Sequence, residues 1–123
     1  MEVSDVLERF SLIAGLSAEE ASPWVDICSD AAESIVLQLK DGVDEKVNEK
    51  RLISAAASLS FYKYILYRAS GEGMNTFAAG DIKITQDKKQ VINSAYTAWC
   101  IERDAIADLL DDDHFLFRKV DLY

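Results

Sequence analysis

The stretch "LISAAASLSFYKYILY", Leu52 to Tyr67, constrains the fold more than any other part of this 123-residue chain. At helical spacing its apolar residues fall on two faces: Leu52, Ala55, Ala56, Leu59, Tyr62 and Leu66 on one, and Ile53, Ala57, Phe61 and Ile65 on the other. A helix that is apolar over so much of its circumference is either central to a core or shared with a partner subunit. The three successive alanines also let a neighbouring helix approach closely. We therefore expect other helices to pack around this one.

The remaining sequence predicts a single, mainly all-α domain over residues 1–123, a small bundle of about four helices. Four signals start or stop helices: Ser4 caps the first helix, Gly15 ends it, Gly42 stops the second, and Gly71 stops the third. After the first helix we expect one helical turn at 18–21 and a second helix at 23–40. The third helix should begin at Asp44 or Asn48 and run to about Ala69, and the last should cover 87–110. Ser17 and Glu20 have the spacing of a capping box, and Pro23 suits a first helical position.

The same periodicity predicts which side chains each helix buries. The expected stripes are Val6, Leu7, Phe10, Ile13 and Ala14 in the first helix, Trp24, Ile27, Cys28, Ala31, Ile35 and Leu39 in the second, and Ile92, Ala95, Tyr96, Trp99, Ile106, Leu109 and Leu110 in the last. Cys28 and Cys100 lack a CxxC partner, and we expect buried reduced thiols. A disulfide between them stays open, since sequence separation does not give distance in space.

Two short segments depart from the helical pattern. Residues 70–80 contain glycines and small polar residues, which predicts a flexible loop, and "FAAGDIKIT" leads into a strand at 81–85. Residues 115–120 alternate in a similar way, within an extended C-terminal tail at 111–123.

These two strands flank a helix of roughly 35 Å. They can pair within one molecule only if the 70–80 loop runs alongside that helix, and otherwise they find partners on neighbouring copies. The candidate assembly interface comprises Phe77, Asp81, Ile82, Lys83, Ile84, Phe115, Phe117 and Arg118.

The charge balance limits the classes of partner. The net charge is −9 and the isoelectric point is about 4.5. Binding to phosphate backbones needs clustered Lys and Arg, so we expect no sequence-specific nucleic-acid binding. The balance instead suits solubility and repulsion from DNA or an anionic membrane.

No pattern predicts catalysis, a cofactor or a resident metal, so we expect a chain that is not an enzyme. His114 is the single histidine, and it ends the tract Asp111–His114. Four consecutive potential ligands rarely point at one ion, and a solvated acidic turn is the favoured interpretation, with a metal-dependent enzyme as the alternative.

Membrane insertion and export are not expected either. The apolar run from Leu52 to Tyr67 is shorter than the roughly 20 residues that span a bilayer, and the N-terminus lacks the basic and apolar regions of a signal peptide. These features predict a cytoplasmic protein.

The order of elements resembles a known family, the head–tail connector proteins of long-tailed bacteriophages and prophages. The likeness is carried by "RLISAAASLSFYKYILYRASG" (51–71), "FAAGDIKIT" (77–85) and "AWCIERDAIADLLDDDHFLF" (98–117). The resemblance implies a virion assembly protein that forms a ring under the portal, extends the DNA channel and docks the tail. Its implied partners are portal and tail-proximal proteins and further copies of itself, first in the bacterial cytoplasm and then in the virion. The alternative from a different class is a small cytosolic helical adaptor or regulator that dimerises through the third helix.

Overall fold

The computed structural model describes residues 1–70 and 88–111, and over these ranges the chain is mainly helical. The helices are α1 (Val3–Ala14), the short α2 (Ala18–Ala21), α3 (Val25–Leu37), α4 (Glu49–Ala69) and α6 (Lys88–Ala105), with 3₁₀ turns η1 (Ser22–Trp24) and η3 (Ala107–Leu109). The predicted small helical bundle is confirmed. The expected loop at 70–80, apart from Ser70, and the expected strands at 81–85 and 115–120 lie outside the described residues.

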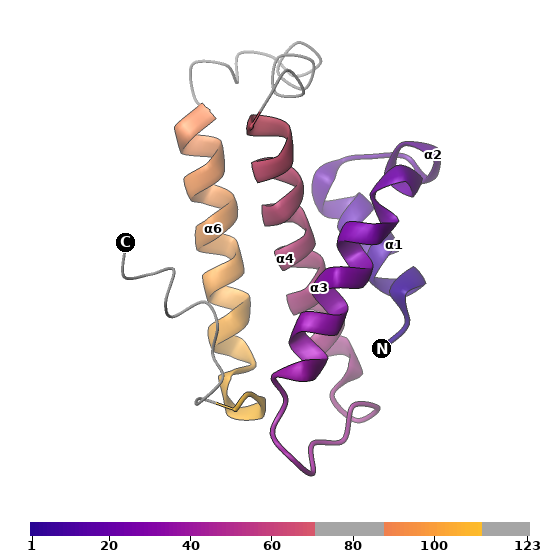
Figure 1. Cartoon of the computed structure of the whole chain (residues 1–123), viewed down its shortest axis with the longest axis vertical. Coiled ribbons are helices and arrows are strands. Elements are labelled where there is room, and N and C mark those ends of the chain that lie inside the picture. The colour runs from indigo at the N-terminus through magenta and orange to yellow at the C-terminus, as the bar shows by residue number, and fades with distance from the viewer. Residues whose placement is uncertain (71–87, 112–123) are drawn as a thin grey trace.

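Helix α4 occupies the centre of the bundle (Figure 1). It packs against α1 and α3, which also pack against each other, and α6 lies along its other side. The middle of α4 is buried almost all round, including Leu52, Leu59 and Ile65 at 0% exposure. Of the two roles that the sequence left open for this helix, the structure therefore shows the first, the centre of a core. No helix in the described ranges is long and apolar enough to cross a membrane.

Local signals set the connection from α1 to α2 as predicted. Gly15 ends α1 with a left-handed φ of 72°, where a residue without a Cβ is favoured. Ser17 and Glu20 form the capping box: the Glu20 amide donates to Ser17 Oγ at 3.1 Å, and the Ser17 amide donates to Glu20 Oε1 at 2.8 Å. The expected cap at Ser4 is wrong, because α1 already begins at Val3 and its N-cap is Glu2.

The second predicted helix ends earlier than its sequence suggests. Instead of running to Lys40 and stopping at Gly42, α3 ends at Leu37 because the next residues pair with a distant segment. Leu39 and Leu110 form an antiparallel bridge, in which the Lys40 amide donates to the Leu109 carbonyl at 2.9 Å and the Asp111 amide donates to the Gln38 carbonyl at 2.7 Å. The last helix was predicted to end at 110, but α6 ends at Ala105, and the residues that follow lead into the same bridge.

The sequence offered Asp44 or Asn48 as the start of the central helix, and the structure uses Asn48 as its N-cap. Asp44 Oδ1 instead accepts the amides of Lys46 and Val47, at 2.9 and 3.2 Å, in the preceding turn. One part of the predicted stripe is also wrong: Tyr64 is buried and Leu66 is exposed.

Aromatic neighbours explain the burial of Tyr64. The rings of Phe10 and Trp24 pack edge-on against the Tyr64 ring, with centroids 5.4 and 4.7 Å away.

Arg51 ties the start of α4 to the end of α6. Its guanidinium donates to Asp108 Oδ1 at 2.6 Å, to the Ala105 carbonyl at 2.7 Å and to Asn48 Oδ1 at 3.1 Å. A cation at the C-terminus of α6 satisfies a free carbonyl and complements the negative end of the helix dipole.

Candidate functional site

The eight residues predicted for an assembly interface all lie outside the described residues. They belong to the ranges 71–87 and 112–123. The structure therefore neither brings them together nor separates them, and candidate surfaces come from the bundle itself.

The most distinctive surface is an acidic face on α2 and α3. Residues 10–39 contain no Lys or Arg, and their five carboxylates are Glu19, Glu20, Asp26, Asp30 and Glu33. All five are exposed, and none forms an ion pair with a described residue.

Helix geometry aligns the carboxylates of α3. Asp26, Asp30 and Glu33 follow one another at i, i+4 and i+7 and so share one side of α3, while Cys28 and Ile35 are buried on the other side. We call these five exposed carboxylates, of which the three on α3 are aligned, the acidic face.

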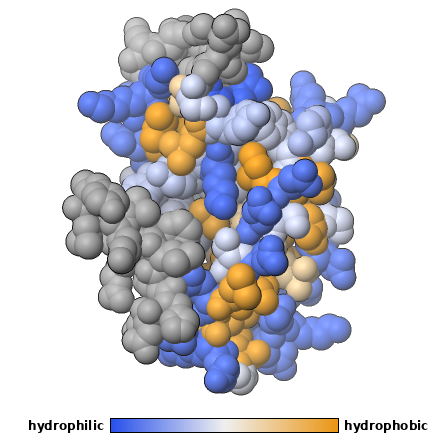
Figure 2. Space-filling view, viewed as in Figure 1, coloured by the Kyte–Doolittle hydropathy of each residue, from blue (hydrophilic) through white to orange (hydrophobic). Residues whose placement is uncertain are grey.

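Apolar side chains also reach the surface, in separate areas. Figure 2 shows hydrophobic areas divided by hydrophilic side chains, with one area over the C-terminal end of α3. Leu37, the last residue of α3, is 75% exposed. Isolated exposures of this kind are ordinary on a soluble surface and do not by themselves mark a site.

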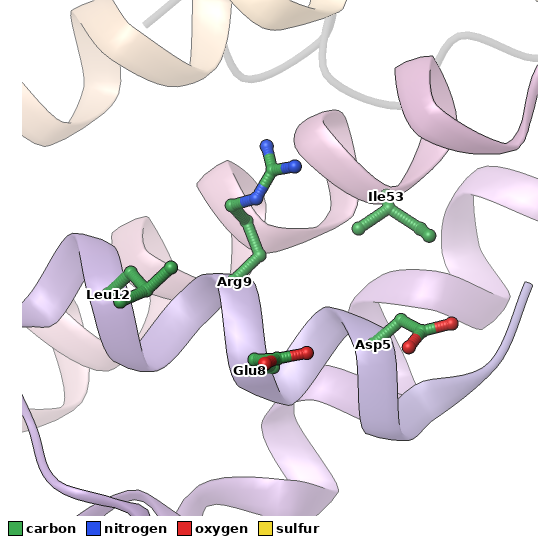
Figure 3. Close-up of a pocket in the computed structure, with 5 residues that line it drawn as sticks. All are labelled: Asp5, Glu8, Arg9, Leu12 and Ile53. Atoms are coloured by element: carbon green, nitrogen blue, oxygen red, sulfur yellow. The ribbon is translucent and has the colours of Figure 1, made fainter.

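A second surface is a shallow groove between α1 and α4 (Figure 3). It has a volume of about 300 Å³ and is lined by Asp5, Glu8, Arg9 and Leu12 of α1 and by Ile53 of α4. The four α1 residues lie on one side of that helix because they follow i, i+3, i+4 and i+7 spacing.

The charges in this α1–α4 groove are not mutually neutralised. Arg9 extends toward α4, where its guanidinium donates to Ser54 Oγ at 2.8 Å. The carboxylates of Asp5 and Glu8 form no ion pair with a described residue. The groove therefore combines apolar side chains with two carboxylates and one guanidinium, which leaves a net charge of −1.

The pKa values of Cys28 and Asp108 are shifted from their ordinary values, and both shifts have structural causes. Burial between α3 and α4 raises the pKa of the Cys28 thiol, which the nearby Ser60 hydroxyl partly opposes. The hydrogen bond from Arg51 lowers the pKa of Asp108. Cys28 and Cys100 are both free thiols, as predicted. The expected burial is confirmed for Cys28, whereas Cys100 is only half-buried.

The predicted acidic turn at 111–114 is described only at Asp111, whose amide donates to Gln38. Within the described ranges, no three His, Cys, Asp or Glu side chains group so as to hold a metal ion.

Sequence reasoning missed both surfaces, for different reasons. The long interval without a cation between Arg9 and Lys40 is visible in the sequence and could have indicated the acidic face. The α1–α4 groove could not have been found in this way, because Ile53 joins the α1 residues only through tertiary packing.

Comparisons with protein-family models, with curated proteins and with solved structures give no match to this chain.

Proposed function

We propose that this protein is a virion assembly subunit of the head–tail connector type, which forms a ring under a phage portal, extends the DNA channel and docks the tail. The single observation that carries the proposal beyond sequence likeness is the acidic face. A segment with five exposed carboxylates and no cation of its own repels the phosphate backbone, so DNA slides past it without being held.

The bundle supplies a suitable wall for such a channel. The carboxylates of α3 stand on a helix whose other side is anchored by Cys28, Ala31 and Ile35, each at most 3% exposed. A rigid helix keeps the charges in fixed positions along one line.

The alternative, an adaptor that dimerises through the third helix, has less support. Ala56, at the centre of that helix, is 0% exposed, and α1, α3 and α6 already pack around α4. A dimer through these residues would require the bundle to open. No other observation favours the adaptor, so we do not propose it.

The proposal predicts a portal gene close to the gene for this chain. The test is assembly of the full chain with that portal protein, followed by electron microscopy and a DNA-retention assay. We expect rings on the portal that do not retain double-stranded DNA. Reversing the acidic line with Asp26→Lys, Asp30→Lys and Glu33→Lys should leave the rings intact and make them retain DNA.

A matched control carries the same charge change on other surfaces, through Glu2→Lys, Asp41→Lys and Asp104→Lys, which are all exposed positions. This control should retain much less DNA than the α3 variant. Failure of the wild-type chain to associate with the portal would overturn the proposed function. Equal retention by both variants would overturn the role of the acidic face.

A further inference from the structure

We infer that the α1–α4 groove is the docking site for residues 115–120 of a neighbouring copy of the same chain. The inference rests on the proposed assembly function and names the contact between copies. The groove is lined by two apolar side chains and has a net negative charge, which calls for an occupant with large apolar side chains and positive charge.

The apolar surface and the negative charge come from different residues. Leu12 is 74% exposed and Ile53 is half-buried, so the apolar surface that they offer is not used by the bundle. Asp5 and Glu8 supply two negative charges, and Arg9, which donates to Ser54 Oγ, keeps its positive charge, so the groove has a net charge of −1.

The sequence of residues 115–120, "FLFRKV", has the complementary chemistry. It joins the large apolar side chains of Phe115, Leu116 and Phe117 to the cations Arg118 and Lys119. Elsewhere two adjacent cations occur at Lys50–Arg51 and at Lys88–Lys89. Neither pair directly follows a run of aromatic residues, and Arg51 is already bound to Asp108.

The last described residue lies across α4 from the groove, and the proposed ring requires contacts between copies, so we assign the tail to a neighbouring copy. Asp111 is held by Gln38 just after η3, at the end of α6, and α6 lies on the opposite side of α4 from α1 (Figure 1). When extended, residues 112–120 would reach about 30 Å. A contact between a groove on one copy and a tail on the next is head-to-tail, the kind that generates rings when the rotation closes.

The test is charge reversal in the full chain, with self-association followed by sedimentation velocity at low salt. Asp5→Lys with Glu8→Lys reverses the groove, and Arg118→Glu with Lys119→Glu reverses the tail. Each double variant alone should associate at least about tenfold more weakly than wild type, because attractive pairs become repulsive. Mixing the two variants should restore association, because each tail then meets a groove of opposite charge.

The control for the groove variant is Asp30→Lys with Glu33→Lys, which makes the same charge change on α3 and should associate like wild type. Three results would overturn the inference: a wild-type chain that stays monomeric, a control that weakens association as much as the groove variant, or a mixture no better than its components. A monomeric wild type would include the case in which the tail occupies its own groove. Portal binding is measured in a separate experiment. If one of these three results is found while the wild-type chain still binds the portal, the docking inference fails and the proposed function stands.

Discussion

Helices α4 and α6 are antiparallel neighbours of similar length, yet they depend on the rest of the molecule in different ways (Figure 1). Among the 21 residues of α4, nine are buried, and three other helices surround it. Among the 18 residues of α6, Ala95 and Trp99 are the two that are buried, and α4 is its main support. The comparison indicates that α4 is stabilised by many small contributions, whereas α6 relies on a few anchors.

The largest expected effect comes from placing the same new charge on each helix. Ala56→Glu in α4 puts a carboxylate at a site with 0% exposure, where no partner can satisfy it, and should destabilise the fold by more than about 4 kcal/mol. Ala98→Glu in α6 is the matched change at an exposed position and should alter stability by less than about 0.5 kcal/mol. Urea unfolding followed by circular dichroism measures both, and similar midpoints would contradict the contrast.

Removing the main anchor of α6 should have the next largest effect. Trp99 is 1% exposed, so Trp99→Ala should cost about 3–5 kcal/mol through lost contacts and a cavity. Native-state hydrogen exchange should show the loss of protection concentrated in α6, with α1 and α4 less affected. Ile101→Ala, at a site that is 63% exposed, is the control and should leave the exchange pattern unchanged. Uniform loss of protection after Trp99→Ala would show that α6 is no less integrated than α4.

The two cysteines extend the comparison with α6 to a second helix, α3. Cys28 lies fully buried on α3 and Cys100 is half-buried on α6. In single-cysteine variants, a maleimide should label Cys100 at least about tenfold faster, because Cys28 reacts only after the core opens. Equal rates would mean that α3 opens as readily as α6.

The thiol of Cys28 also links stability to pH. Because its folded-state pKa is raised, the unfolded chain loses the thiol proton first as pH rises. The free energy of unfolding should therefore fall above about pH 8.5, and Cys28→Ala should reduce that fall.

The smallest expected effect concerns the tie between the two helices at Arg51. The pKa of Asp108 is lowered by the Arg51 hydrogen bond, so its stabilising contribution is present above about pH 4 and is lost as pH falls through the folded-state value. Asp108→Asn should lower the unfolding midpoint only slightly at pH 7, because the Asp108 side chain is 65% exposed and the ion pair is largely screened. The difference from wild type should shrink as pH falls and Asp108 becomes protonated. Asp41→Asn, at another exposed carboxylate, is the control.

Structural features that are set by residues close together in the sequence could be predicted, whereas features set by distant residues could not. The capping box at Ser17, the stop at Gly15 and the broad apolar surface of α4 are properties of short stretches, and all three predictions are confirmed. The end of α3 could not be predicted, because it depends on a bridge between Leu39 and Leu110.

Side-chain burial in α4 shows the same limit. Helical periodicity alone predicted that Leu66 is buried, but Leu66 is exposed in the structure. Tyr64 is buried in its place, because the rings of Phe10 and Trp24 pack against it. The predicted interface residues lie outside the described residues, so those predictions stay predictions. The acidic face could have been read from a charge count, but the groove at Ile53 needed the packing of α1 on α4.

The bridge between Leu39 and Leu110 has a mechanical consequence. Traction on the chain beyond Asp111 would first load the hydrogen bond from the Asp111 amide to the Gln38 carbonyl and that from the Lys40 amide to the Leu109 carbonyl. Force would thus pass into the α3–α4 connection before α6 could unwind from its C-terminal end. Tension applied beyond Asp111 would therefore reach α3, which lies on the opposite side of the central helix from α6.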